Sequence, residues 1–294
     1  MQTETVDLDA LPPEWIDIAE HPAYGTAARQ LAQNMLAIID SDRKLAAVFQ
    51  DAGHYVAAMS AAYLEANGDL TLSTLRQLCA GSGFLTANRA GALVDFMVHI
   101  GFVERRSALH CKTTPAFQRA WGGHLQAALD AAAFVDPAMG AARDALGDPE
   151  VYQRFLATQG ERLHELARMA DPSPTFRSVF LHPRAGSSIL HTLALACTDA
   201  AFVPHAGAPV SLAGLARRFG VSQPHVRRVL KGAEAHAYLL HLGPSIRAFH
   251  PHGFETIRYY YAMRIGELIR CARAVMGTNM RAAQTATARC VAAR

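Results

Sequence analysis

The chain lacks the segments that would anchor it in a membrane or export it. Residues 1–20 contain acidic residues but no lysine or arginine, and they have no apolar core of the kind that a secretory signal needs. No apolar run approaches the ~20 residues that cross a bilayer. We therefore predict a soluble, cytoplasmic protein with no membrane partner.

Cysteine is sparse and irregularly spaced. The five cysteines are Cys79, Cys111, Cys197, Cys271 and Cys290, and an odd number at wide spacings indicates reduced, intracellular thiols. We interpret Cys79 and Cys111 as small packing residues. No Cys-x2-Cys pair, and no His-x3-His pair with suitable partners, accompanies the histidines, so we predict no metal site.

Patterns of the common catalytic folds are also missing. The chain has no strand–GxGxxG–helix unit, which excludes a typical nucleotide fold. No nucleophile, base and carboxylate converge in an obvious set. We predict a protein that is not an enzyme and that carries no cofactor.

What the sequence does have is length, alanine and an uneven charge. At 294 residues, 51% of them hydrophobic, it is long enough for two domains with a core each. The scarcity of β-branched residues predicts a mainly α fold. Residues 1–70 hold 11 acids and 3 bases, whereas residues 211–294 hold 13 bases and 3 acids. The basic region is what a polyanion-binding surface requires, although it is equally compatible with a solvated basic face.

The chain also repeats itself. HPAYGTAARQLAQNML begins at His21 and HPRAGSSILHTLALAC begins at His182, each with a Gly followed by Thr or Ser that we expect to cap a helix. Each copy is followed by a helix–turn–helix pattern, a strand-like run and a helix that starts with proline, at Pro115 and Pro251. The repeat predicts an acidic arm (1–20), a first unit (21–135), a helical connector (136–181), a second unit (182–276) and a disordered tail (277–294).

The second unit has the clearer helix–turn–helix. Ser211 and Ser222 are suited to cap two helices, and Gly220 stands where the chain turns between them. The apolar spacing predicts that one face of each helix is buried, through Leu212, Leu215 and Ala216 on the first and Val226, Val229 and Leu230 on the second.

The other face of the second helix, which we take as a recognition helix over residues 222–232, is polar and basic. Its outward residues are Gln223, Pro224, Arg227, Arg228 and Lys231. Arginine pairs with guanine and glutamine with adenine in the major groove. We expect His225, Arg217 and Arg218 to contact phosphates, and Arg247 to lie near the tip of a β wing formed by residues 237–250.

In the first unit, GFVERRSALHCKTTPAF resembles the strand–wing–strand segment of MarR-type winged-helix regulators, through Gly101-Phe102-Val103, Arg105, Arg106, Lys112 and Thr114-Pro115. With both units, the resemblance covers about two-thirds of the chain. It implies tandem winged helix-turn-helix domains whose flanking helices pair across a two-fold axis. In that family two chains form the pair. Here one chain could form a pseudo-dimer, and a homodimer also remains open, as does an unidentified small-molecule effector.

The first unit departs from that pattern. Its turn, CAGSGFL, is longer than usual, and the groove-facing positions hold Ala87, Asn88, Gly91 and Ala92. Thr86 is the expected N-cap, Asn88 could read adenine, and Arg89 could hold a phosphate. Arg105 and Arg106 in the wing are better phosphate ligands. The helix either reads DNA or serves as scaffold.

These patterns together predict a sequence-specific transcriptional regulator that binds double-stranded DNA. Joint binding by both units would cover two half-sites about one helical turn apart. Tandem winged helices also occur in protein-interaction adaptors and replication initiators, and the sequence leaves these alternatives open.

Overall fold

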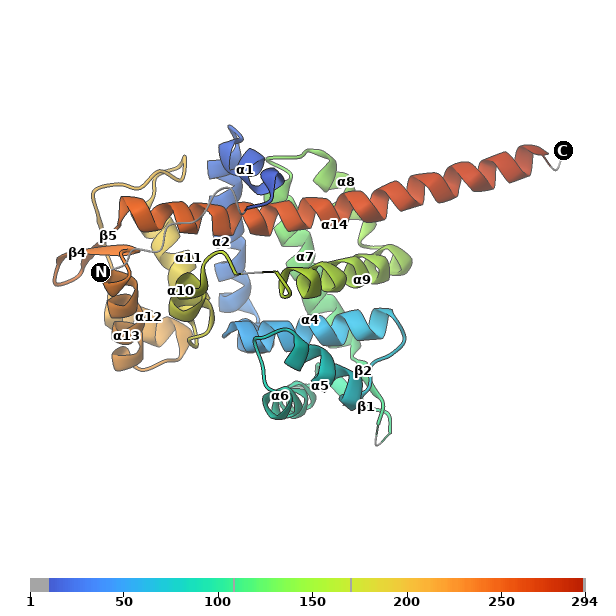
Figure 1. Ribbon diagram of the computed structural model, residues 1–294, viewed down its shortest axis with the longest axis horizontal. Coiled ribbons are helices and arrows are strands. Elements are labelled where there is room, and N and C mark those ends of the chain that lie inside the picture. The colour runs from blue at the N-terminus through green and yellow to red at the C-terminus, as the bar shows by residue number, and fades with distance from the viewer. Residues whose placement is uncertain (1–10, 108, 170, 293–294) are drawn as a thin grey trace.

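The computed structural model is mainly helical, with small antiparallel sheets, as the composition predicts (Figure 1). It describes residues 11–107, 109–169 and 171–292, and for residues 278–292 it describes the backbone alone. Within these ranges no helix combines the length and the apolar character that a bilayer crossing requires.

The first half of the chain contains seven helices and one hairpin in the described residues. They are α1 (Pro13–Glu20), α2 (Tyr24–Ser41), α3 (Arg43–Val48), α4 (Ala52–Ala66), α5 (Leu72–Gly81), α6 (Ala87–His99), β1 (Val103–Arg105), β2 (Cys111–Thr113) and α7 (Pro115–Ala132). Threonine caps three of the helices, because Thr71, Thr86 and Thr114 each accept a hydrogen bond from a backbone N–H of the first turn. The predicted cap at Thr86 and helix start at Pro115 are confirmed.

The second half begins with α8 (Ala138–Ala145), α9 (Pro149–Leu166), α10 (Pro174–Phe176) and a π-helical turn, η2 (Arg177–Leu181). There follow α11 (Gly186–Cys197), β3 (Ala208–Pro209), α12 (Leu212–Phe219), α13 (Gln223–Ala235), β4 (Leu239–Gly243), β5 (Ile246–Phe249) and α14 (Pro251–Ala292). The three strands pair antiparallel in the order β3-β5-β4, with Leu239 opposite Phe249.

One continuous core joins the two halves, where the sequence suggested a core for each. Buried apolar side chains form a single cluster from Leu11 to Val275. Helix α9 packs against both α4 and α14, and α2 packs against both α7 and α11 (Figure 1). The segment 136–181, expected as a helical connector, contains α8, α9, α10 and η2, and its buried side chains belong to this single core.

The N-terminal arm is docked on the far end of the chain. Trp15 is 4% exposed, and its indole Nε1–H donates a hydrogen bond of 3.3 Å to Glu267 Oε1 on α14. The packing is close because Gly266 has no side chain, and an added Cβ there would lie 3.1 Å from Trp15 Cδ1. Residues 1–10 of the arm lie outside the described residues.

The glycines of the two His-Pro repeats have a different role from the one predicted. Neither α2 nor α11 has a side-chain cap, and their N-cap residues are Ala23 and Ala185. Instead, Gly25 lets α2 approach the backbone of Ala201, and Gly186 does the same at Phe180. A Cβ on these two glycines would lie 2.1 and 2.4 Å from the respective carbonyl oxygens.

Helix α14 is longer than predicted. It runs without a break to Ala292, where the sequence suggested a helix that ends near 276 and a disordered tail. Figure 1 shows its C-terminal turns extending beyond the rest of the molecule. Residues 293–294 lie outside the described residues.

Candidate nucleic-acid interface

Helices α12 and α13 meet at a turn whose backbone the sequence predicts well. Ser211 Oγ accepts a hydrogen bond of 3.0 Å from the N–H of Gly214, and Ser222 Oγ accepts one of 3.3 Å from the N–H of His225. Gly220 has φ 62° and ψ 37°, the left-handed conformation that glycine adopts at little cost. All three roles were predicted and are confirmed.

Burial on one side of α13 fixes which side faces outward. Val226, Val229, Leu230 and Ala233 are at most 4% exposed, and Leu215 and Ala216 of α12 are also buried. Leu212, predicted to be buried with them, is only half-buried. Because the buried positions follow the helical repeat, α13 has a fixed orientation on the core.

The outward face of α13 is exposed and its cations are unpaired. Gln223, Pro224, Arg227, Arg228 and Lys231 are all exposed. No hydrogen bond or ion pair within the described part of the chain holds Arg227, Arg228 or Lys231. On α12, Arg217 is also exposed, and no hydrogen bond or ion pair within the described residues holds it. These cations are therefore free to bind an external anion.

Two of the predicted phosphate ligands already have partners. Arg218 binds Asp40 of α2 through Nε–Oδ1 at 3.1 Å and Nη2–Oδ2 at 2.7 Å. His225 Nε2 lies 2.7 Å from the carbonyl oxygen of Arg184. This contact places an exposed arginine, Arg184, beside the start of α13. Sequence reasoning missed Arg184, because it lies some forty residues before the recognition helix.

Arg247 is placed differently from the sequence-based expectation. We predicted it near the tip of the wing, but it is 7% exposed and lies inside the hairpin. Its Nε forms an ion pair of 2.6 Å with Glu234 of α13, and its Nη1 donates hydrogen bonds to the carbonyls of Gly243 and Ile246. Arg247 therefore holds the hairpin against α13 and is not available to DNA.

The exposed part of this hairpin is apolar where we expected basic residues. Leu242 is 51% exposed and Ile246 is 45% exposed, on either side of the Pro244-Ser245 tip. The β1–β2 hairpin also carries an apolar side chain, Leu109, at 66% exposure. A contiguous exposed apolar patch can mark a contact with another protein, whereas single exposed apolar side chains are common.

In the first unit, every arginine predicted to bind DNA has a carboxylate partner. Arg89 Nη2 lies 3.3 Å from Asp51 Oδ2, and Asp51 is 8% exposed. Arg105 pairs with Asp95, and Arg106 pairs with Glu104. Burial alone would raise the pKa of Asp51, but hydrogen bonds from His54 and the positive charge of Arg89 outweigh it and lower this pKa. The carboxylate therefore stays ionised and competes with a phosphate for Arg89.

One position on the outward face of α6 is covered by a side chain of α5. Thr86, Ala87, Asn88 and Ala92 are exposed, as predicted, whereas Gly91 is buried beneath the guanidinium of Arg76. A Cβ at Gly91 would lie 2.8 Å from Arg76 Nε. Gly91 follows its N-cap Thr86 by five residues, as Arg227 follows Ser222. The guanidinium of Arg76 in the first unit thus lies at the position that corresponds to Arg227 in the second unit. Sequence reasoning missed Arg76.

The turn that precedes α6 contacts residues of the second half of the chain. Residues 82–86 separate α5 from α6, whereas only residues 220–222 separate α12 from α13 in the second unit. The ring of Phe84 lies 4.7 Å from the Arg177 guanidinium and 5.9 Å from the ring of His182. The two helix pairs are therefore connected through residues 177–185.

The cysteines and histidines of the described residues are dispersed, and three of the cysteines are buried. No group of three or more His, Cys, Asp or Glu there is arranged to hold a metal ion. Burial raises the pKa of Cys79 and of Cys197 to about 11 and that of Cys271 to about 12, so these thiols are protonated at neutral pH.

Comparison with family models, curated protein sequences and solved structures finds no match for this chain.

Proposed function

We propose that the chain is a sequence-specific DNA-binding transcriptional regulator with two winged helix-turn-helix units, in which the second unit reads the DNA. The observation that carries this proposal is the outward face of α13. Arg227, Arg228 and Lys231 are exposed and unpaired there, on a helix whose other face is buried in the core.

The chemistry of this face suits the major groove. Arg227 or Arg228 can donate two hydrogen bonds to O6 and N7 of guanine, and Gln223 can donate one to N7 of adenine while it accepts one from the N6 amino group. Arg217 on α12 and Arg184 before α11 flank the helix as exposed cations, a suitable arrangement for phosphates on either side of a groove. The wing contributes little charge, since Arg247 is buried.

The first unit is assigned a supporting role in this proposal. Its three predicted DNA-binding arginines would have to leave Asp51, Asp95 and Glu104 before they could bind phosphates. Asn88 is exposed but has no exposed, unpaired cation beside it on α6. Arg76 of α5 is the exposed cation that lies over this face, so we expect the face to bind DNA more weakly than α13 does.

The test is binding of the purified full chain to a mixed-sequence DNA duplex, followed by selection from a random library. DNA binding by the α13 face predicts a steep loss of affinity between low and moderate salt, because bound phosphates release counterions. It also predicts enrichment of one short motif. Absence of binding at low salt, or enrichment of no motif, would contradict the proposal.

A second candidate is a protein-interaction adaptor, and one observation favours it. The exposed Leu242, Ile246 and Leu109 place apolar side chains at the ends of both hairpins. An adaptor would bind a partner with little dependence on salt. Substitution of Leu242 and Ile246 by serine would abolish that interaction and leave DNA binding intact.

A further inference from the structure

An apolar cavity of about 210 Å³ lies at the junction of the two halves of the chain. It is bounded by α2, α4 and α7 from the first half and by α9, α11 and α14 from the second. By area its wall is mostly apolar, as is typical of sites for small organic molecules, and the polar side chains in it include Asp51, His124, Gln159, Arg162, Arg264 and Glu267.

One of those polar groups is an arginine without a carboxylate partner. Arg264 of α14 lines the cavity, and its Nη1 donates a hydrogen bond of 3.1 Å to the hydroxyl of Tyr260. Its guanidinium also lies over the rings of Tyr55 and Tyr260, at 5.8 and 5.9 Å. Arg264 is half-buried. Within the described residues these are its charge-stabilising contacts, and a cation withdrawn from water normally has a counter-ion.

The carboxylates that line the same cavity are already neutralised. Asp51 accepts hydrogen bonds from His54 and is paired with Arg89, and Glu267 is paired with Arg162 at 3.0 Å. Arg264 therefore supplies a positive charge that no nearby carboxylate balances.

A second side chain in the wall lacks a hydrogen-bond partner. His124 of α7 is 3% exposed, and its Nδ1 makes no hydrogen bond. Burial and the charge of Arg264 lower the pKa of His124 to about 3, so the ring is neutral. Gln159 Oε1, also in the wall, is a further unpaired buried atom. Orphaned polar groups of this kind are rare in folded proteins, and a ligand would satisfy them.

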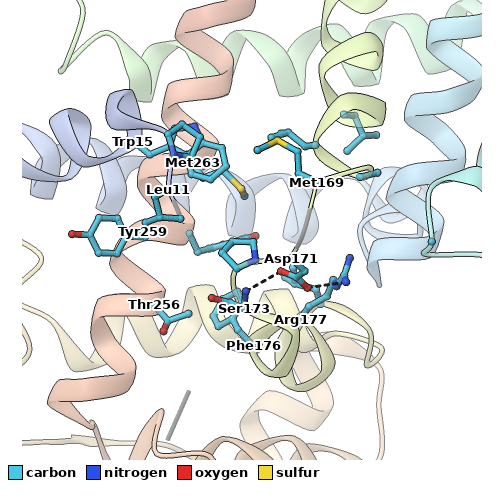
Figure 2. Close-up of a pocket in the computed structure, with 18 of the residues that line it drawn as sticks. Leu11, Trp15, Met169, Asp171, Ser173, Phe176, Arg177, Thr256, Tyr259 and Met263 are labelled. Atoms are coloured by element: carbon cyan, nitrogen blue, oxygen red, sulfur yellow. Dashed lines mark hydrogen bonds and ion pairs between the residues drawn. The ribbon is translucent and has the colours of Figure 1, made fainter. Parts of the chain in front are cut away.

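A larger cavity adjoins the inner one. It has a volume of about 310 Å³ and shares Phe84, Leu181, Tyr260 and Met263 with the inner one. Figure 2 shows its lining, with Trp15 and Met263 on one side and Met169 on another. Met169 is 50% exposed, so the outer cavity reaches the surface there.

We propose that the inner cavity binds a small organic carboxylate with an apolar body, and that Arg264 pairs with the carboxylate group. A single arginine matches a monoanion and offers it two parallel hydrogen bonds. At protein packing density the volume holds roughly ten non-hydrogen atoms. This inference is independent of DNA binding.

The test is calorimetric titration of the full chain with four probes: benzoate, hexanoate and the neutral amides of the same two acids. At least one acid is expected to bind with a Kd of about a millimolar or tighter, and its amide at least about tenfold more weakly. Comparison of the two acids distinguishes an aromatic from an aliphatic body. Phenyl phosphate tests the charge match, and we expect it to bind more weakly than benzoate.

Matched variants then locate the site. R264M is expected to lose at least about tenfold in affinity for the acid, and R270M, an exposed position on the same helix outside the cavity, is expected to keep it. H124F, which retains the ring packing, should weaken binding. If R264M does not give the wild-type circular dichroism spectrum, the comparison of acid with amide and the affinity of H124F for the acid decide whether the proposal holds. No binding by either acid, equal binding of acid and amide, or full binding by R264M would overturn the proposal.

Discussion

Arg218 on α12 and Asp40 on α2 form a two-point ion pair, with Nε–Oδ1 at 3.1 Å and Nη2–Oδ2 at 2.7 Å. The pair joins the helix before the recognition helix to the N-terminal half. Both side chains are more than one-third exposed, so the pair adds little to stability. Its main effect is to hold a cation that would otherwise face the proposed DNA.

Release of Arg218 is therefore expected to strengthen DNA binding. D40N should raise affinity for a mixed-sequence duplex about two- to fivefold at low salt, since the phosphate no longer competes with a carboxylate. The control is D17N, which removes an exposed acid of α1 and changes the net charge equally. If fluorescence anisotropy gives the same gain for both variants, general charge and not Arg218 is responsible.

The buried pair of Arg247 and Glu234 is expected to matter for stability and not for DNA contact. R247A should lower the free energy of unfolding by about 2–4 kcal/mol, because it leaves Glu234 without its cation and two carbonyls without a donor. R228A, which removes an exposed arginine, should change it by less than about 0.5 kcal/mol. Urea unfolding measures both, and equal effects would contradict the assignment of Arg247.

Stability is also expected to fall in mild acid. Burial and the charge of Arg264 lower the pKa of both His124 and His191 to about 3, against about 6.5 in the unfolded chain. The unfolded state thus binds more protons between these values, and stability is complete above pH 6.5. Each histidine should cost about 2 kcal/mol at pH 5.

The histidine prediction is checked by substitution. H124F should reduce the slope of unfolding free energy against pH by about 1.4 kcal/mol per unit between pH 6 and 5. H99F removes an exposed histidine of α6 and is the matched control. An unchanged slope in H124F would mean that His124 is not held neutral by the fold.

Local features of the interface were predictable from the sequence, and long-range ones were not. The caps at Ser211 and Ser222 and the left-handed Gly220 depend on neighbours within a few residues. The burial of Arg247 depends on Glu234, thirteen residues away, and on the hairpin register. The merging of both halves in one core depends on contacts such as Trp15 with Glu267, which no local pattern specifies.

The same distinction explains the first unit. Its helices and hairpin follow from Thr71, Thr86 and Pro115, which act locally. The ion pair of Arg89 depends on Asp51, which caps α4 and lies thirty-eight residues earlier in the chain. Sequence reasoning therefore identified the helices but not the ion pair of Arg89 with Asp51.

A footprint on the selected DNA motif should be short. Because the first-unit arginines are paired, we expect protection of less than ~15 base pairs per chain, which is one half-site and its flanks. Hydroxyl-radical footprinting gives this length directly. Protection of two segments one helical turn apart by a monomeric chain would show that both units bind.

The most direct test of the central claim is anisotropy titration of the double variant R227A/R228A against R105A/R106A. Each double variant removes two exposed arginines. Arg227 and Arg228 have no carboxylate partner in the structure, whereas Arg105 and Arg106 each have one. R227A/R228A is expected to lower affinity at least about tenfold and to reduce the salt slope by about two. R105A/R106A is expected to change affinity less than about twofold. Equal losses in the two variants, or no loss in R227A/R228A, would contradict the assignment of α13 as the DNA-reading helix.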